Sequence, residues 1–203
     1  MKKAEKTKQF IIERAATIFN EKGIAGTSID DILKASNVAK GCLYGHFESK
    51  EELSHASVDF MLGKLAERRD LSLSLQKTAK GKLFAFMDNN RNPLKSFIDG
   101  GCPIVNLSTE TDDTNPAIKK KVRTMLDAAI KLFTKILQDG VKEGEFSEEL
   151  IPEEFATKMF LAIEGGNAIC RVLNSAKPMQ TLIKSLKSEL ESYSLPFLEN
   201  SNL

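Results

Sequence analysis

The chain has 203 residues, of which 41% are hydrophobic and 28% charged, which suits a packed core beneath a well-solvated surface. Its net charge is only +1, but residues 1–50 contain nine basic side chains against six acidic ones, so positive charge gathers near the N-terminus, as a phosphate-binding surface requires. No run of residues approaches the 18 apolar positions of a membrane span, and three separated cysteines indicate neither a disulfide framework nor a zinc site.

The first expected helices lie near the N-terminus. Apolar residues recur at helical spacing from Ile11 to Phe19, which predicts an amphipathic helix that ends before Gly23. Thr27 is the expected N-cap of a second helix. Asp30 is its expected partner in a capping box, with a shorter side chain than the usual Glu or Gln. Asn37 then marks a sharp turn, because asparagine tolerates the left-handed conformation.

A short third helix is expected over residues 39–46, with Leu43 facing inward. Ser49 and Glu52 form a Ser-x-x-Glu capping box, which predicts the start of a fourth helix that runs to about Leu65. A helix, a tight turn and a short helix in this order are typical of the helix-turn-helix, whose second helix enters the DNA major groove. We therefore expect a three-helix DNA-binding domain over residues 1–50.

The remaining part, residues 51–203, also shows helical periodicity and no sustained strand alternation. Residues 72–90 are periodic, and a short apolar segment lies within residues 99–115, which are rich in Gly, Thr, Asp and Asn. Three further long helices are expected to open at prolines, at Asn115-Pro116, Pro152 and Pro178. The sequence thus predicts an all-α protein of about nine helices, with a larger helical domain after residue 50.

The polar residues in and around the short third helix suit a polyanion better than a core. Gly41 permits close approach of the backbone, and Tyr44 and His46 supply donors for phosphate. Ser28 and Lys50 stand at the N-termini of the flanking helices, where free N–H groups favour an anion. A helix of about eight residues is unstable alone, so its sequence indicates a surface that is held in place to contact a partner.

Ten residues between positions 10 and 53 form an ordered pattern, and they are Gly23, Gly26, Thr27, Ile32, Val38, Gly41, Tyr44, Phe47, Lys50 and Leu53. With this pattern, residues 10–53 resemble the DNA-binding domain of the tetracycline-repressor (TetR) family of bacterial transcriptional regulators. Ala39 and Asn37 depart from the family pattern, which more often has Ser or Thr and Gly at these positions. Residues 101–107 are similar to a Gly-Cys-Pro/Leu motif of one subgroup, and the rest of the chain fits the family's variable ligand-binding and dimerisation domain.

The resemblance implies a role for each polar residue of the DNA-binding domain. Lys40 and Cys42 are expected to reach base edges, with Gly41 allowing close approach, and Lys40 can donate to guanine. The residues expected to hold phosphates are Thr27, Ser28, Tyr44, His46 and Lys50. The implied partners are a palindromic operator in double-stranded DNA, a second copy of the chain and an unidentified small-molecule inducer. No metal or cofactor and no contact with a membrane are expected, and the expected location is the cytoplasm.

The resemblance also implies an inducer pocket and a dimer interface in the larger domain. The polar Glu164 and Asn167 stand among apolar residues, where they need partners or a cavity. The expected pocket residues are Phe84, Met87, Cys102, Met125, Phe133, Phe160, Glu164 and Asn167. The dimer is expected to be built mainly from the last two long helices, near residues 152–174 and 178–196, with Leu182, Leu186 and Leu190 at the interface. The function expected is that of a ligand-responsive repressor.

Two alternatives to a repressor that is released by a small-molecule inducer remain open. Cys102 is either a small buried residue or, in its Gly-Gly-Cys-Pro loop, a sensor of oxidants or electrophiles. A helical interaction module without DNA binding is the other alternative. An enzyme is not expected, because the chain has two histidines and none of the common nucleophile, metal or phosphate-loop motifs.

Overall fold

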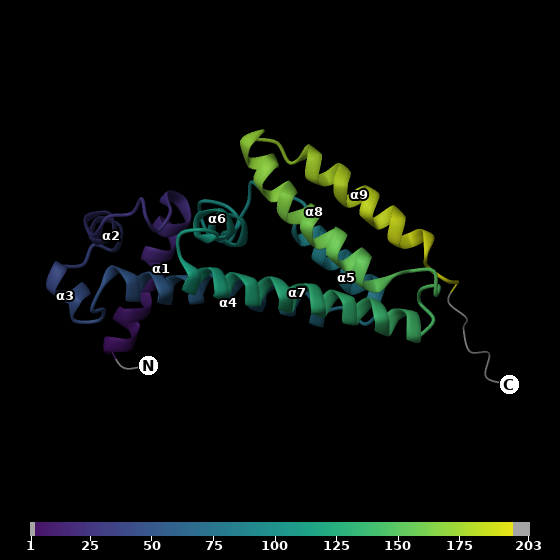
Figure 1. Ribbon diagram of the computed structural model, residues 1–203, viewed down its shortest axis with the longest axis horizontal. Helices are drawn as coiled ribbons and strands as arrows, with labels where there is room; N and C mark the ends of the chain where they lie inside the picture. Colours follow the sequence, from purple (N-terminus) through teal and green to yellow (C-terminus); the bar gives the residue numbers. More distant parts are fainter. Residues whose placement is uncertain (1–2, 197–203) are drawn as a thin grey trace. The chain divides into compact units, whose positions relative to one another are not determined.

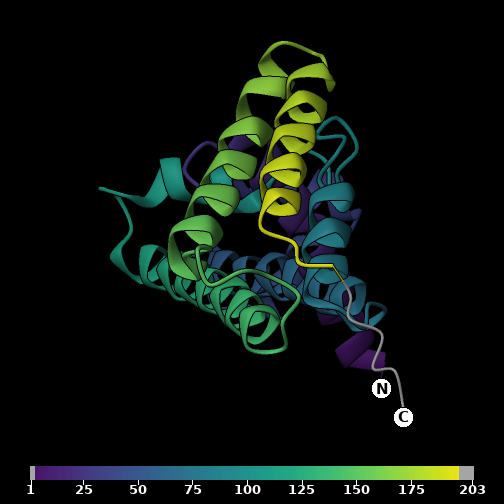
Figure 2. The same cartoon turned by 90° about the vertical axis from the view of Figure 1, so that its right-hand side faces the viewer.

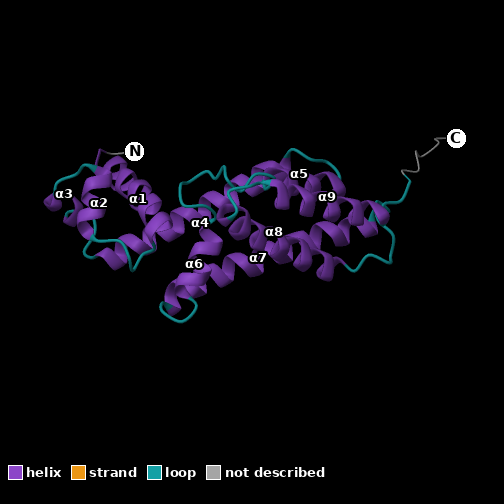
Figure 3. Cartoon of the chain, turned by 90° about the horizontal axis from the view of Figure 1, so that it is seen from above, coloured by secondary structure: helices purple, strands orange, loops and turns teal. Residues whose placement is uncertain are grey.

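The computed structural model describes residues 3–196, and within this range it contains nine helices and no strand (Figures 1 and 3). The helices are α1 (Lys3–Lys22), α2 (Ile29–Ser36), α3 (Lys40–Tyr44), α4 (Lys50–Ser74), α5 (Ala79–Asn89), α6 (Pro103–Thr111), α7 (Pro116–Lys142), α8 (Pro152–Val172) and α9 (Lys177–Ser192). The predicted all-α class with about nine helices is confirmed. Among the described residues, no helix is both long and apolar enough to cross a membrane.

Two stretches differ from the helices predicted. Helix α4 continues past Leu65 to Ser74, because no glycine or proline stops it there and Leu73 is still buried. The expected periodic segment 72–90 is therefore divided between the end of α4 and helix α5. Residues 103–111, expected only as an apolar segment, form α6, which has Pro103 in its first turn and buries Ile104 and Leu107.

The contacts between residues divide the chain into two compact units, and α4 and α7 contribute residues to both. Unit 1 consists of residues up to Glu67 and of Lys95–Thr124. Its main core cluster comprises Ile11, Ala15, Phe19, Ile32, Leu43, Phe47 and Leu53. The expected boundary between functional domains, at residue 50, is the first residue of α4 and stays a prediction.

Unit 2 consists of Arg68–Leu94 and the residues from Met125 onward. Helices α8 and α9 run side by side in it, as the green and yellow helices of Figure 2 show. Gly166 lies at this contact, where a Cβ atom would lie 2.7 Å from Cε of Met179, so a larger residue there would make the Met179 side chain shift. The carboxylate of Glu145 accepts hydrogen bonds from the backbone N–H of Ala79 and Lys80, at 2.8 and 3.1 Å, and so caps the start of α5.

Candidate nucleic-acid interface

The short helix α3 is held against unit 1 by apolar side chains. Leu43 and Phe47 are 1% and 2% exposed, and both belong to the cluster that contains Ile11 and Phe19 of α1. Burying two large apolar side chains contributes about 1.5–3 kcal/mol each. This is how a helix of five residues, too short to be stable alone, keeps a fixed position.

The N-terminus of α2 is capped by Ser28, one residue later than predicted. The Ser28 Oγ atom accepts a hydrogen bond from the backbone N–H of Asp31 at 3.1 Å, and Asp31 accepts one from the backbone N–H of Ser28 at 3.0 Å. Lys22 at the end of α1 also donates to Asp31, at 2.7 Å. The hydrogen bonds from Lys22 and Ser28 hold the pKa of the Asp31 carboxyl well below its usual range.

Thr27, which the sequence predicted as a cap and as a phosphate ligand, is 1% exposed. Its hydroxyl donates to the backbone carbonyl of Gly23 at 2.6 Å, within the turn between α1 and α2. Because the side chain is buried and already hydrogen-bonded, we do not retain Thr27 as a phosphate contact. Ser28 is exposed and stays a predicted contact at the N-terminus of α2.

The turn between α2 and α3 follows the prediction for Asn37, which adopts the left-handed conformation with φ of 50° and ψ of 38°. Ala39 occupies the N-cap position of α3, and no side chain caps this end. Helix α3 spans Lys40–Tyr44, and the chain leaves it at Gly45, so the helix is shorter than the predicted 39–46. His46 lies just after α3 and is half-buried.

Helix α3 presents a polar surface of three exposed residues, which are Lys40, Gly41 and Tyr44. A Cβ atom at Gly41 would have no neighbour within 4 Å, so packing within the chain does not require glycine there. Cys42 is half-buried and packs against the apolar cluster, which leaves only part of its side chain for a contact with a base. The structure therefore brings Lys40, Gly41 and Tyr44 together on one open surface.

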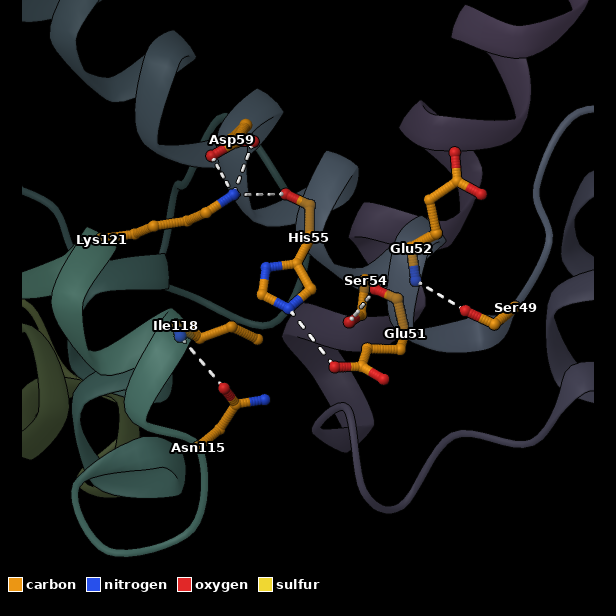
Figure 4. Close-up of polar contacts among 9 residues, drawn as sticks. All are labelled: Ser49, Glu51, Glu52, Ser54, His55, Asp59, Asn115, Ile118 and Lys121. Atoms are coloured by element: carbon orange, nitrogen blue, oxygen red, sulfur yellow. Dashed lines mark hydrogen bonds and ion pairs between the residues drawn. The ribbon is translucent and has the colours of Figure 1, made fainter.

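The start of α4 is fixed by local caps (Figure 4). Ser49 accepts a hydrogen bond from the backbone N–H of Glu52 at 3.1 Å, as predicted for a capping box. The Glu52 carboxylate, however, accepts from the backbone N–H of Glu48, at 2.7 Å. Lys50, the first residue of α4, is half-buried.

Helix α7 also contacts α4 through polar side chains. Lys121 of α7 donates to both carboxylate oxygens of Asp59, each at 2.7 Å, and to the backbone carbonyl of His55 at 3.4 Å (Figure 4). Asn115 caps α7 by accepting from the backbone N–H of Ile118 at 3.0 Å, as predicted. The start of α7 is thus joined to α4 within unit 1.

Contacts that α1 and the turn after it make with residues 99–111, which include α6, were not predicted from the sequence. Asn20, which is 5% exposed, donates to the backbone carbonyls of Asp99 and Gly101 at 2.7 and 3.1 Å. Glu110 of α6 accepts from the backbone N–H of Ala25 at 2.8 Å. A polar Asn20 at the end of an apolar helix face was the one available signal. These contacts place α6 against the helix-turn-helix.

The expected pocket residues are only partly brought together. Phe133 and Phe160 contact each other in unit 2 with ring centroids 6.1 Å apart, and the third ring of the cluster is Phe86, 4.3 Å from Phe133. Phe84 instead lies beneath the ammonium group of Lys187, 4.6 Å from it.

The other expected pocket residues have varied surroundings. Met87 is buried and Met125 half-buried. Asn167 is 8% exposed and donates to Glu164 at 3.1 Å, so these two polar groups satisfy each other in part. Cys102 is half-buried and is the N-cap residue of α6, in unit 1, whereas the other expected pocket residues belong to unit 2.

Two of the three leucines expected at a dimer interface lie in the core of the single chain. Leu186 and Leu190 are 4% and 0% exposed, because they face the chain's own helices, and Leu182 is half-buried. Helix α8, the other helix expected at the interface, has three large exposed apolar residues, which are Leu161, Ile169 and Val172. Because both are buried within the single chain, Leu186 and Leu190 are not available for a dimer interface, in contrast to the prediction.

A helix-turn-helix with an exposed second helix, followed by a larger set of helices, defines a DNA-binding regulator. Residues 11–56 match the family model described as "Bacterial regulatory proteins, tetR family", and residues 79–186 match "Tetracyclin repressor-like, C-terminal domain". The second match alone covers more than half of the chain. The chain belongs to the TetR family and is a transcriptional regulator.

Individual relatives agree with this assignment over nearly the whole chain. The crystal structure of a TetR transcriptional regulator from Chloroflexus aurantiacus is 33% identical, with a TM-score of 0.91, and the match covers 96% of this chain and 98% of that one. The transcriptional repressor DhaR of a Mycobacterium species is 23% identical over 95% of this chain and 94% of its own length. The regulator CifR in complex with operator DNA has the same fold, with 19% identity, a TM-score of 0.77 and coverage of 90% and 95%.

Proposed function

We propose that the protein is a homodimeric repressor that binds a partly palindromic operator through α3 and releases it when a small molecule binds unit 2. The observation that carries the proposal is the exposed group of Lys40, Gly41 and Tyr44 on a helix anchored by buried side chains. Repression is supported by the name of DhaR, and operator binding by the complex of CifR.

The side chains expected at the DNA contact either phosphates or bases. Tyr44 and Lys50 contact phosphates, which set affinity and register but carry no base information. Ser28 and His46 add donors on either side of α3. Lys40 extends from the first position of α3, from where its ammonium group reaches guanine O6 or N7 in the major groove.

Dimer formation uses the exposed apolar stripe of α8. Leu161, Gly165, Ile169 and Val172 are all exposed and follow each other at intervals of four, four and three residues, which is the spacing of a helix–helix seam. Val172 and Leu161 are 85% and 59% exposed in the single chain, so a partner helix would remove a large apolar surface from water. One α3 reads only a few base pairs, and a two-fold dimer doubles the site.

An inducer would bind next to the aromatic cluster of Phe86, Phe133 and Phe160 in unit 2. Glu164 and Asn167 would orient its polar end, since a ligand can replace their mutual hydrogen bond. Release of DNA requires that the ligand favour a dimer geometry in which the two α3 helices no longer match successive major grooves.

Thiol chemistry at Cys102 is a second candidate for the same switch. The half-buried thiol stands at the start of α6, next to Gly101, whose carbonyl accepts a hydrogen bond from Asn20 of α1. A modified Cys102 would therefore disturb a segment that contacts the helix-turn-helix. Cys102→Ser should abolish release of DNA by electrophiles and leave release by a reversible inducer unchanged.

A band-shift titration of the full-length protein against the DNA upstream of its own coding sequence tests the proposal. We expect a saturable complex that resists non-specific competitor DNA and weakens steeply with salt. Tyr44→Ala should weaken it, whereas Leu71→Ala, on the exposed side of α4, should not. Equal binding to operator and random DNA would contradict the role of a sequence-specific repressor.

A further inference from the structure

A groove with a basic lining lies between the end of α5, with the residues just after it, and residues 177–187 of α9, all in unit 2. Its volume is about 540 Å³, large enough for a small molecule. One wall carries Asp88 and Arg91, and the other carries Lys177, Thr181, Lys184 and Lys187. The α9 residues recur at intervals of four, three and three positions, so one face of this helix lines the groove.

The positive charge of this groove is mostly uncompensated. Asp88 pairs with Lys187, with 2.7 Å between Oδ2 and Nζ. Within residues 3–196, no acidic side chain pairs with Arg91, Lys177 or Lys184, and the first turn of α9 contains no acidic residue. Three cations therefore converge on one concave surface without a counter-charge from the described part of the chain.

The composition of unit 2 does not explain this concentration. Over the two segments of unit 2 the sequence contains 14 Lys and Arg against 14 Asp and Glu, so the unit is neutral as a whole. Like charges placed together cost free energy through mutual repulsion, and a cleft lined by one sign of charge concentrates counter-ions. An anion in the groove would remove the repulsion.

We propose that this groove binds a small polyanion that carries two or more phosphate groups. Arginine and lysine together are the usual ligands of phosphate, the guanidinium as a two-pronged donor and the ammonium as a point charge. The Thr181 hydroxyl adds a neutral donor in the middle of the α9 wall. The groove is distinct from the aromatic cluster of Phe86, Phe133 and Phe160 and from the DNA-binding surface of α3, so the site is separate from the function proposed above.

Calorimetric titration of the full-length protein with pyrophosphate, without DNA and in about 50 mM salt, tests the proposal. We expect one saturable site per protomer, with an affinity that falls as salt is added. Lys177→Gln combined with Lys184→Gln should weaken binding by about tenfold or more, because two of the three uncompensated charges are lost. Both side chains are exposed, so the folded state should be retained, which circular dichroism checks.

The matched control removes two lysines of α7, Lys131→Gln combined with Lys142→Gln, which are exposed and belong to the same unit. This variant has the same net charge as the groove variant and should bind pyrophosphate within about twofold of the unmodified protein. A third variant, Lys40→Gln with Lys50→Gln, tests the DNA-binding surface as a source of phosphate binding. Loss of pyrophosphate binding in this third variant, or equal loss in the groove and control variants, would overturn the proposal.

ADP serves as the second probe. If ADP and pyrophosphate bind equally well and both depend on Lys177 and Lys184, the groove holds the phosphates alone. Tighter binding of ADP with the same dependence shows that the groove holds a nucleotide. Binding of either probe that shows no saturation would contradict the site, because loosely attracted ions do not saturate.

Discussion

The side-chain amide of Asn106 donates hydrogen bonds to both the backbone carbonyl and the side-chain oxygen of Asn20, at 3.0 and 3.1 Å. The same amide also donates to the carbonyl of Gly100 at 3.1 Å. Asn20 is the third residue from the end of α1, and Asn106 lies on α6. One side chain thus joins the last turn of α1, the glycine loop and α6.

Removing this amide should lower the stability of unit 1. In Asn106→Ala the three oxygens lose their donor in a partly buried place, which we expect to cost about 1–3 kcal/mol in the free energy of unfolding. Urea denaturation measures the change. Thr109→Ala on the same helix is the control, since the exposed Thr109 hydroxyl bonds only to carbonyls of its own helix. Equal losses in the two variants would contradict a bridging role for Asn106.

Gly100 should not tolerate a side chain. Its φ angle is +94°, and a Cβ atom there would lie 2.5 Å from the backbone carbonyl oxygen of Asn20. Gly100→Ala should therefore destabilise the protein by more than about 1 kcal/mol. Gly63→Ala, in α4 with no neighbour within 4 Å, should instead stabilise it by about 0.5–1 kcal/mol. Thermal unfolding of the two variants should show shifts of opposite sign.

The Asp31 carboxyl should make stability depend on pH at the acid end. Its pKa in the folded state lies below the ordinary value of 3.8, because Lys22 and Ser28 donate to the carboxylate. The stabilisation is therefore present in full above the unfolded pKa and is lost as the pH falls through the folded pKa. Asp31→Asn should be less stable than the unmodified protein at pH 7, and the difference should shrink below about pH 4.

Asp30→Asn is the matched variant for this test, since it removes the same charge from the same turn and Asp30 is exposed. Urea unfolding at several pH values compares the two variants. A difference between Asp31→Asn and the unmodified protein that stays constant from pH 7 to 3 would speak against the ion pair and the cap as its cause.

Substitutions in α3 should separate affinity from sequence preference. Tyr44→Ala should weaken binding to all DNA sequences alike, because a phosphate contact does not distinguish bases. Lys40→Ala should relax the preference at one position per half-site, by about 1–3 kcal/mol. Band-shift titrations with single-base operator variants measure both effects. A uniform loss in Lys40→Ala would assign this lysine to the phosphates.

The α8 stripe should determine self-association. Val172→Glu should shift the protein toward a monomer, since it would place a charge in an apolar interface. Light scattering at micromolar concentration measures the mass. Leu71→Glu is the control, because Leu71 is similarly apolar and 65% exposed on α4 but lies outside the stripe. A Val172→Glu variant that keeps the mass of the unmodified protein would remove α8 from the interface.

The helix-turn-helix could be predicted because its determinants are local. The apolar spacing from Ile11 to Phe19 and the left-handed turn at Asn37 depend on neighbours in the sequence. The choice between Thr27 and Ser28 as the cap of α2 did not follow, since both residue types cap helices. It is decided by the burial of Thr27 against the carbonyl of Gly23.

Residues of unit 2 were harder to place because their surroundings come from distant helices. Phe84 and Phe86 lie two positions apart on α5, and only the packing of other helices decides which joins the aromatic cluster. Likewise, Leu182, Leu186 and Leu190 of α9 have a spacing that is found both at helix interfaces between chains and on the core face of a helix. Leu186 and Leu190 belong to the core because α9 covers the chain's own helices.

Helix α3 is fixed by residues that do not face outward, Leu43 and the following Phe47, whereas Lys40, Gly41 and Tyr44 make no contribution to the main apolar cluster of unit 1. Anchoring and recognition are thus carried by separate positions of one short segment. The outward positions can therefore be exchanged as a set at little cost in stability. The scaffold is in this respect suited to retargeting, in which a new operator preference is selected from a small library at residues 40 and 41 while the phosphate contact of Tyr44 is kept.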